Sequence, residues 1–256
     1  MTAPRLRLAA AGEAAGLAAF LARLLHFDKA AVVRLRAGGE ALALFGNPPF
    51  GGVLAVRTAR LAQAADLDVT VSAGQLLDGT DEEDGTLAVP SGVTGPPWTG
   101  LLPPRGGWSR TAELDAEDAR RVVAAAVAEF RARSEALDPD RRTRAGLDAL
   151  ADEIWSRSPG GTGLPLRALH AAHALGFLRP ARAASATGAG AATGAAAGAG
   201  AAAGGTGGGG GAEDAAGPAE ELVLLAAGPW LMLRTPYGAV AVRRAGPASG
   251  LSVTPA

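Results

Sequence analysis

The stretch AASATGAGAATGAAAGAGAAAGGTGGGGGAEDAAGP, residues 183–218, decides how this chain is organised. It consists of Ala, Gly, a little Thr and Ser, the acidic pair Glu213–Asp214 and a final proline, with no aromatic residue and no Val, Ile or Leu. Such a segment cannot bury enough apolar surface to offset the entropy that its backbone would lose on ordering. We therefore expect residues 183–218 to form a disordered Ala/Gly-rich connector.

Three short apolar runs follow the connector, at residues 222–226, 230–234 and 239–243. Gly–Pro and Pro–Tyr–Gly sequences separate them and are typical of turns, so the pattern predicts an antiparallel meander. So small a group of strands is marginally stable when alone. We therefore expect these strands to pack onto residues that precede the connector, so that the fold closes across it.

The N-terminal half combines a helix with strands. Residues 13–26 carry apolar side chains at helical spacing, which predicts an amphipathic helix. Short apolar runs at residues 31–36, 41–45 and 53–60 are separated by Gly38–Gly39 and by a Gly/Pro-rich segment, which predicts an antiparallel meander with two turns. Residues 68–72 and 86–89 are expected to add strands.

A Pro/Gly-rich segment, residues 90–107, separates this half from a helical one. Asp115 is expected to cap a first helix, Asp138 and Pro139 to begin a second, and Pro165 to begin a third. The predicted fold class is α+β, with three helices completed by the C-terminal meander. The predicted division is a domain at 1–110, a domain at 111–182 plus 219–256, and the connector at 183–218.

Composition excludes several classes of function. The chain has no cysteine, so disulfides, thiolate nucleophiles and Cys-ligated metal centres are excluded. A net charge of −1 gives no long-range attraction to nucleic acid or to an acidic membrane. No Walker A, G-x-S-x-G or S-x-x-K motif occurs. We expect a cytoplasmic protein with no membrane span, no cofactor and no catalytic residue.

The strongest candidate for a binding surface is the segment that holds Trp98, Arg105 and Trp108. Long irregular segments inside compact chains tend to serve function. An indole face and a guanidinium can together hold a planar or anionic group. The alternative is that both indoles anchor an otherwise irregular crossing to the core, with Arg105 in solvent.

His170 and His173 lie three residues apart in the third predicted helix, so their side chains project to one side. Two imidazoles at this spacing can share a metal ion, although a site needs a third and usually a fourth ligand. The alternative is that both are histidines at the edge of the core, because Leu166 and Leu169 follow the same helical stripe.

Three stretches resemble those of uncharacterised conserved actinobacterial proteins. They are PPRGGW at residues 103–108, LRALHAAHALGFL at residues 166–178 and PYG at residues 236–238. The likeness spans most of the chain apart from the connector, and it implies no activity.

Three functions therefore compete. The favoured one is a non-enzymatic protein that binds a protein partner or a small ligand through the Trp/Arg segment. The second is a winged-helix-like DNA-binding regulator, because two helices followed by strands give the required order. The third helix exposes only Arg167 for base readout, however, and the connector would fall before the wing. The third is a metal-dependent hydrolase that uses His170 and His173.

Overall fold

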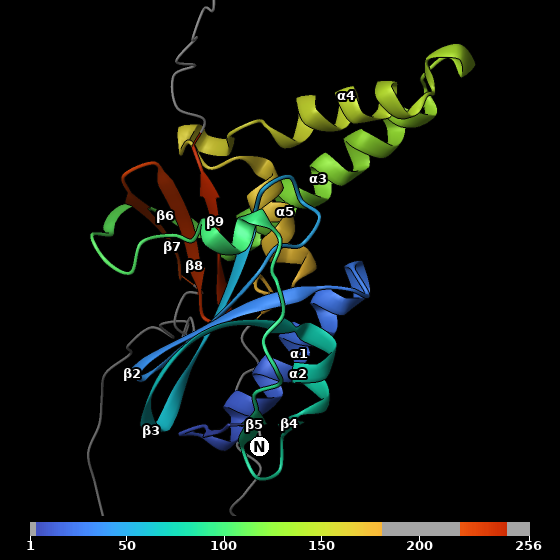
Figure 1. Ribbon diagram of the computed structural model, residues 1–256. Coiled ribbons are helices and arrows are strands. Elements are labelled where there is room, and N and C mark those ends of the chain that lie inside the picture. The colour runs from blue at the N-terminus through green and yellow to red at the C-terminus, as the bar shows by residue number, and fades with distance from the viewer. Residues whose placement is uncertain (1–3, 181–220, 245–256) are drawn as a thin grey trace, which may run out of the picture.

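The computed structural model describes residues 4–180 and 221–244, which form an α+β fold with two antiparallel sheets (Figure 1). The strands are β1 Arg5–Arg7, β2 Val32–Gly46, β3 Leu54–Ser72, β4 Thr80–Asp81, β5 Thr86–Ala88, β6 Ser109–Asp115, β7 Glu221–Ala227, β8 Trp230–Thr235 and β9 Gly238–Arg243. The α-helices are α1 Ala11–Phe27, α2 Ala73–Asp78, α3 Ala116–Glu135, α4 Arg144–Trp155 and α5 Leu166–Ala174. Short 3₁₀ helices are η1 Pro97–Gly100, η2 Pro139–Arg141 and η3 Pro159–Gly161. The predicted connector lies outside the described residues.

The larger sheet has six strands in the order β2-β3-β9-β8-β7-β6. Its C-terminal strands β7, β8 and β9 are interior strands, because β9 pairs with β3 and β7 pairs with β6. The expectation that the last strands pack onto residues preceding the connector is confirmed. The sheet contains strands from both predicted domain ranges, and the domain division stays a prediction.

The turn expected at Gly38–Gly39 is absent, because β2 continues through both glycines as one strand. Its pairing with β3 shifts register between Gly39 and Ala41, and Gly39 has a φ of 62°. A glycine at positive φ bends a strand through a bulge, so the chain turns without leaving the sheet. The two strands expected within residues 53–72 are likewise one long strand, β3, which pairs with β2 on both sides of the register shift.

Most helix boundaries agree with expectation, and one does not. The Asp115 carboxylate caps α3 by accepting a hydrogen bond from Asp118 N at 2.8 Å, as predicted. Asp138 and Pro139 begin only the single turn η2 and not the second helix. Helix α4 begins at Arg144, where the Thr143 hydroxyl accepts a hydrogen bond from Gly146 N at 3.1 Å. The Thr143 hydroxyl thus caps the Gly146 N–H, which has no partner within the helix, and this cap defines the start of α4.

The six-stranded sheet has two different faces. Leu42, Leu44 and Val240 join the main core, which also contains the apolar stripes of α1 and α5. Side chains that alternate with them point the other way and form two smaller clusters, around Phe45 and around Trp230. The segment between β5 and β6 (green in Figure 1) crosses this second face. Within the described ranges, none of the helices combines the length and apolar character that a membrane crossing requires.

Candidate functional site

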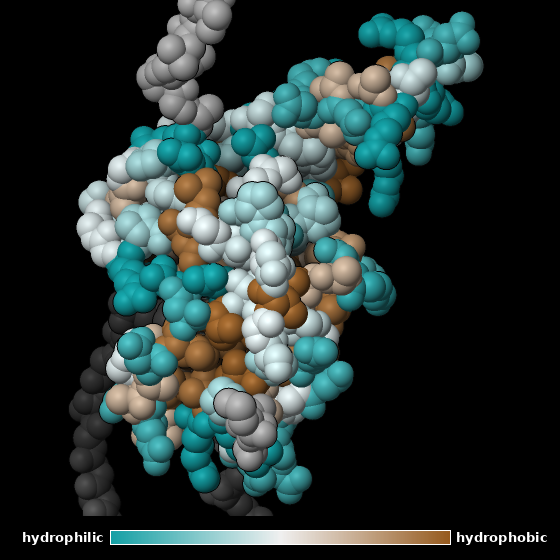
Figure 2. All heavy atoms as spheres, viewed as in Figure 1, coloured by the Kyte–Doolittle hydropathy of each residue, from teal (hydrophilic) through white to brown (hydrophobic). Residues whose placement is uncertain are grey.

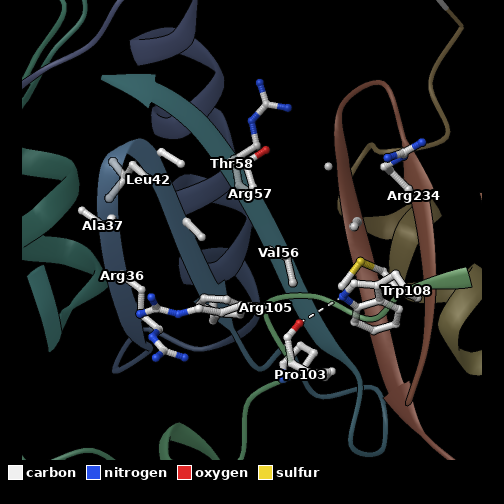
Figure 3. Close-up of a pocket in the computed structure, with 18 of the residues that line it drawn as sticks. Arg36, Ala37, Leu42, Val56, Arg57, Thr58, Pro103, Arg105, Trp108 and Arg234 are labelled. Carbon is white, nitrogen blue, oxygen red and sulfur yellow. Dashed lines mark hydrogen bonds between the residues drawn. The ribbon is translucent and has the colours of Figure 1, made fainter. Parts of the chain in front are cut away.

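An open cavity of about 620 Å³ lies on the second face of the six-stranded sheet (Figure 3). The described residues that line it come from α1, β2, β3, β8 and β9 and from the segment 103–108, which forms a wall above the strands. This volume falls in the range of cavities that hold small molecules, about 300–1,000 Å³. Figure 2 shows hydrophobic surface on the viewed face of the molecule, bordered by hydrophilic side chains. The cavity is therefore the candidate ligand-binding site.

The floor of the cavity is apolar because small and apolar side chains on neighbouring strands share one face. Phe45, Val56 and Ala239 lie in register across β2, β3 and β9 and are buried. Trp108 forms part of the wall, and its indole Nε1 donates a hydrogen bond to Pro104 O at 3.0 Å. This bond holds the ring in place and leaves the indole with no further donor, so the ring offers a ligand only its apolar surface.

The charged groups of the cavity are nearly all guanidinium groups. Arginines line it at four positions, and the single carboxylate in its described lining is that of Glu13. The four arginines are Arg36, Arg57, Arg105 and Arg234. Cations that converge on a partly apolar cavity raise the local potential and attract anions.

Of the four arginines that line the cavity, only Arg36 makes an ion pair with a described carboxylate, and it shares that carboxylate with Arg34. Arg36 Nε lies 3.4 Å from Asp68 Oδ2, and Arg34 Nε lies 2.7 Å from Asp68 Oδ1. The hydrogen bond from Arg34 is the largest cause that lowers the pKa of Asp68, and the charges of Arg36 and Arg105 add to it. One carboxylate therefore faces three cations at this end of the cavity, which leaves an excess of positive charge.

Arg105 and Arg234 are exposed, and within the described residues neither side chain makes a hydrogen bond or an ion pair. Figure 3 places Arg105 beside Arg36 on one side of the cavity and Arg234 on the other side, well separated from both. Arg57 extends away from these groups in the same view. The cavity thus has a cationic group on each side and an apolar floor between them.

Of the three residues predicted for binding, two line the cavity, and binding by any of them stays a prediction. Arg105 and Trp108 line the cavity, whereas Trp98 does not. Trp98 is half-buried and packs on both small clusters of the second face, so it anchors the crossing segment. Sequence reasoning missed Arg36 and Arg234. The alternation of Arg34 and Arg36 with buried Val33 and Leu35 was a visible signal for Arg36, but no local pattern points to Arg234.

His170 and His173 differ in their surroundings. The His170 ring stacks on Trp155 with centroids 4.4 Å apart and meets the edge of Phe50 at 5.1 Å. Burial lowers the pKa of His170, and the charge of His173 lowers it further. His173 is exposed. Across residues 4–180 and 221–244, no three His, Cys, Asp or Glu side chains gather in a group that could hold a metal ion. Metal binding by this pair stays a prediction.

Two family models together cover most of the chain. One, described as Domain of unknown function (DUF8010), matches residues 1–100. The other, described as Domain of unknown function (DUF8185), matches residues 103–247, which is more than half of the chain. The chain therefore belongs to the DUF8185 family. No curated protein and no solved structure matches it.

Proposed function

We propose that this member of the DUF8185 family is a non-enzymatic cytoplasmic protein that binds a small organic anion in the cavity on its six-stranded sheet. One observation carries the proposal: four of the five charged residues that line the cavity are arginines, and three of these, Arg57, Arg105 and Arg234, have no ion pair within the described residues. The actinobacterial resemblance supports no narrower assignment and stays a prediction.

The arginines favour an anion for a geometric reason. A guanidinium group is always charged and presents its donors as a planar fork that fits a carboxylate or a phosphate. Arg105 and Arg234 can each offer this fork without breaking an ion pair to another described residue. The cost of desolvating a buried anion is reduced because the cavity is open to solvent.

The floor and wall favour an organic anion over an inorganic one. Phe45, Val56 and Ala239 provide an apolar surface, and the Trp108 ring lies beside it. A ligand with an apolar ring or chain would cover the part of this floor and of the Trp108 ring that still faces the cavity, which contributes roughly 25 cal/mol per Å² of apolar area removed from water. The anionic group orients the ligand, and the apolar contact adds affinity.

Calorimetric titration tests the proposal with three probes of similar shape and different charge. Benzoate and phenyl phosphate should bind, whereas neutral benzamide should bind at least tenfold more weakly, since a charge-assisted hydrogen bond contributes about 1.5–3 kcal/mol. R105Q and R234Q should each weaken benzoate binding by about tenfold. R144Q is the matched control, because Arg144 is 93% exposed and, among the described residues, pairs only with Asp148 on its own helix, 3.6 Å away.

Salt provides an independent check on the same titration. Added sodium chloride should weaken binding of the anions because it screens charges that are open to solvent, and it should leave any binding of benzamide unchanged. The proposal is wrong if benzamide binds as tightly as benzoate, or if R105Q and R234Q bind benzoate as the unaltered protein does.

The two alternatives gain no support. A winged helix needs a hairpin that is free to reach DNA, and β8 and β9 are paired on both sides inside the six-stranded sheet. A metal-dependent hydrolase needs a third ligand near His170 and His173, and the described part of the chain places none there.

A further inference from the structure

A second cluster of arginines lies on the opposite side of β3 from the cavity floor. Arg57 of β3, Arg23 of α1 and Arg179, which follows α5, line a small crevice beside Tyr237. None of the described residues that line this crevice carries a carboxylate. Three guanidinium groups with no carboxylate between them form an unusual arrangement, because like charges repel unless an anion separates them.

Arg57 occupies the centre of this cluster. Its Nη1 donates a hydrogen bond to Tyr237 O, and its Nε is buried without an acceptor in the described part of the structure. Burial lowers the pKa of Arg57, and the charge of Arg179 lowers it further, while Glu13 opposes the effect. Glu13 Oε2 is already an acceptor for Arg60 N at 2.8 Å. The positive charge of Arg57 is therefore incompletely offset.

Two glycines make room for the guanidinium groups. A Cβ at Gly16 would lie 2.6 Å from Arg57 Nη2, and a Cβ at Gly176 would lie 2.8 Å from Arg23 Nη2. Any other residue at either position would displace the guanidinium group next to it. The Arg57 guanidinium therefore packs closely against the backbone of α1, and the Arg23 guanidinium packs closely against the backbone that follows α5.

Arg179 completes the cluster from the outside. Its Cζ lies 3.9 Å from the centroid of the Tyr237 ring, which holds the exposed guanidinium over the crevice. Arg23 makes one weak hydrogen bond, from Nη1 to Ala19 O of its own helix at 3.4 Å. Within the described ranges neither side chain makes an ion pair, so their remaining donors are available to a ligand.

We infer that this cluster binds a tetrahedral oxyanion of the phosphate class. The crevice itself measures about 10 Å³, which is room for about one water molecule, so the anion lies at its mouth. There it accepts hydrogen bonds from Arg23 and Arg179 and offsets the charge of Arg57. Arg57 lines both the cavity and the crevice, but Arg23 and Arg179, the two groups that donate to the anion, do not line the cavity.

Tyr237 gives a direct readout, since it is the only tyrosine of the chain. Protein labelled with 3-fluorotyrosine gives one ¹⁹F NMR signal, which comes from the ring that lies beneath Arg179. Titration with inorganic phosphate at constant ionic strength should shift this signal in a saturable manner, while chloride alone should not. A titration with phenyl phosphate in place of inorganic phosphate shows whether the site prefers a phosphomonoester or the free ion. Binding of either probe supports the site, provided that it depends on Arg23 and Arg179.

The variants separate this site from the cavity. R23Q and R179Q should each weaken phosphate binding by about tenfold, because each removes a charge-assisted hydrogen bond. R105Q should leave the phosphate-induced shift unchanged even if it abolishes benzoate binding. Thermal melts should show that R179Q, altered at an exposed side chain, remains folded. The inference is overturned if phosphate causes no saturable shift, if chloride causes the same one, or if R23Q and R179Q both bind phosphate with unaltered affinity.

Discussion

Val56 of β3 lies directly opposite Ala239 of β9 in antiparallel register, which joins the N-terminal hairpin to a strand that follows the predicted connector. β9 in turn pairs with β8, and β8 with β7, which pairs with β6. The last strands therefore form the middle of the sheet, and both the floor of the cavity and the Tyr237 crevice depend on them.

A chain that ends at residue 182 should not melt cooperatively. It would lack the three interior strands, whose Leu224, Leu233 and Val240 are fully buried. The apolar side chains of β3 and β6 would then lose the partners against which they pack. Circular dichroism and urea denaturation check this. A truncated chain with the melting temperature and cooperativity of the full chain would show that the terminal meander is dispensable.

Substitution of the two tryptophans should separate anchoring from binding. W98A should lower the free energy of unfolding by about 2 kcal/mol, because the ring packs on both clusters of the second face. W108A should cost less stability and should weaken benzoate binding, because its ring is part of the cavity wall. Urea denaturation and calorimetry on both variants measure the two effects. Equal effects of both substitutions on binding would contradict the separate roles.

Stability should fall as the pH drops below about 6.5, and His170 should account for part of the loss. The folded protein holds the pKa of His170 below its ordinary value of 6.5, so the unfolded chain binds its proton first. The contribution is therefore complete above pH 6.5 and is lost as the pH falls toward the lowered pKa. Urea denaturation at several pH values checks this.

The matched variants are H170Q and H173Q. H170Q should reduce the dependence of stability on pH in this range, because it removes the group that the folded state keeps neutral. H173Q alters an exposed residue and should have a smaller effect. An unchanged slope in H170Q would show that other groups cause the pH dependence.

Glu153 should titrate far below an ordinary glutamate. Hydrogen bonds from Arg133, the largest cause, and from Arg157 lower the pKa of Glu153 from 4.5 to about 2. A carboxyl ¹³C NMR titration checks this value. R133Q should raise the pKa toward 4.5, and so should high salt, since the groups are exposed. R144Q, on the same helix as Glu153, should leave the titration unchanged.

Much of the fold could be predicted from local patterns. The helical spacing of Leu17, Leu21 and Leu24 located α1, and the Asp115 cap located the start of α3. The patterns failed where a short element depends on a distant partner. β6 was missed because its residues are exposed or half-buried, and only pairing with β7 makes them a strand. β1 was missed for the same reason, since it exists through its pairing with β5.

The candidate sites were only partly predictable. Sequence identified Arg105 and Trp108 because they stand in an irregular segment rich in Pro and Gly. It could not identify Arg234, which comes from a strand far along the chain and reaches the cavity through sheet pairing. The crevice was not predicted either, because Arg23, Arg57 and Arg179 come from three separate elements.

The sequence by itself determined helix α1, the start of α3 and most of the longer strands, that the last strands need a partner before the connector, and that cysteine chemistry is excluded. These properties follow from composition and from periodicities within a few residues. Only the tertiary structure decided that β9 pairs with β3 and that arginines gather on both sides of that strand. Such convergence depends on strand order and register, which no local pattern encodes because the partners are far apart in the chain.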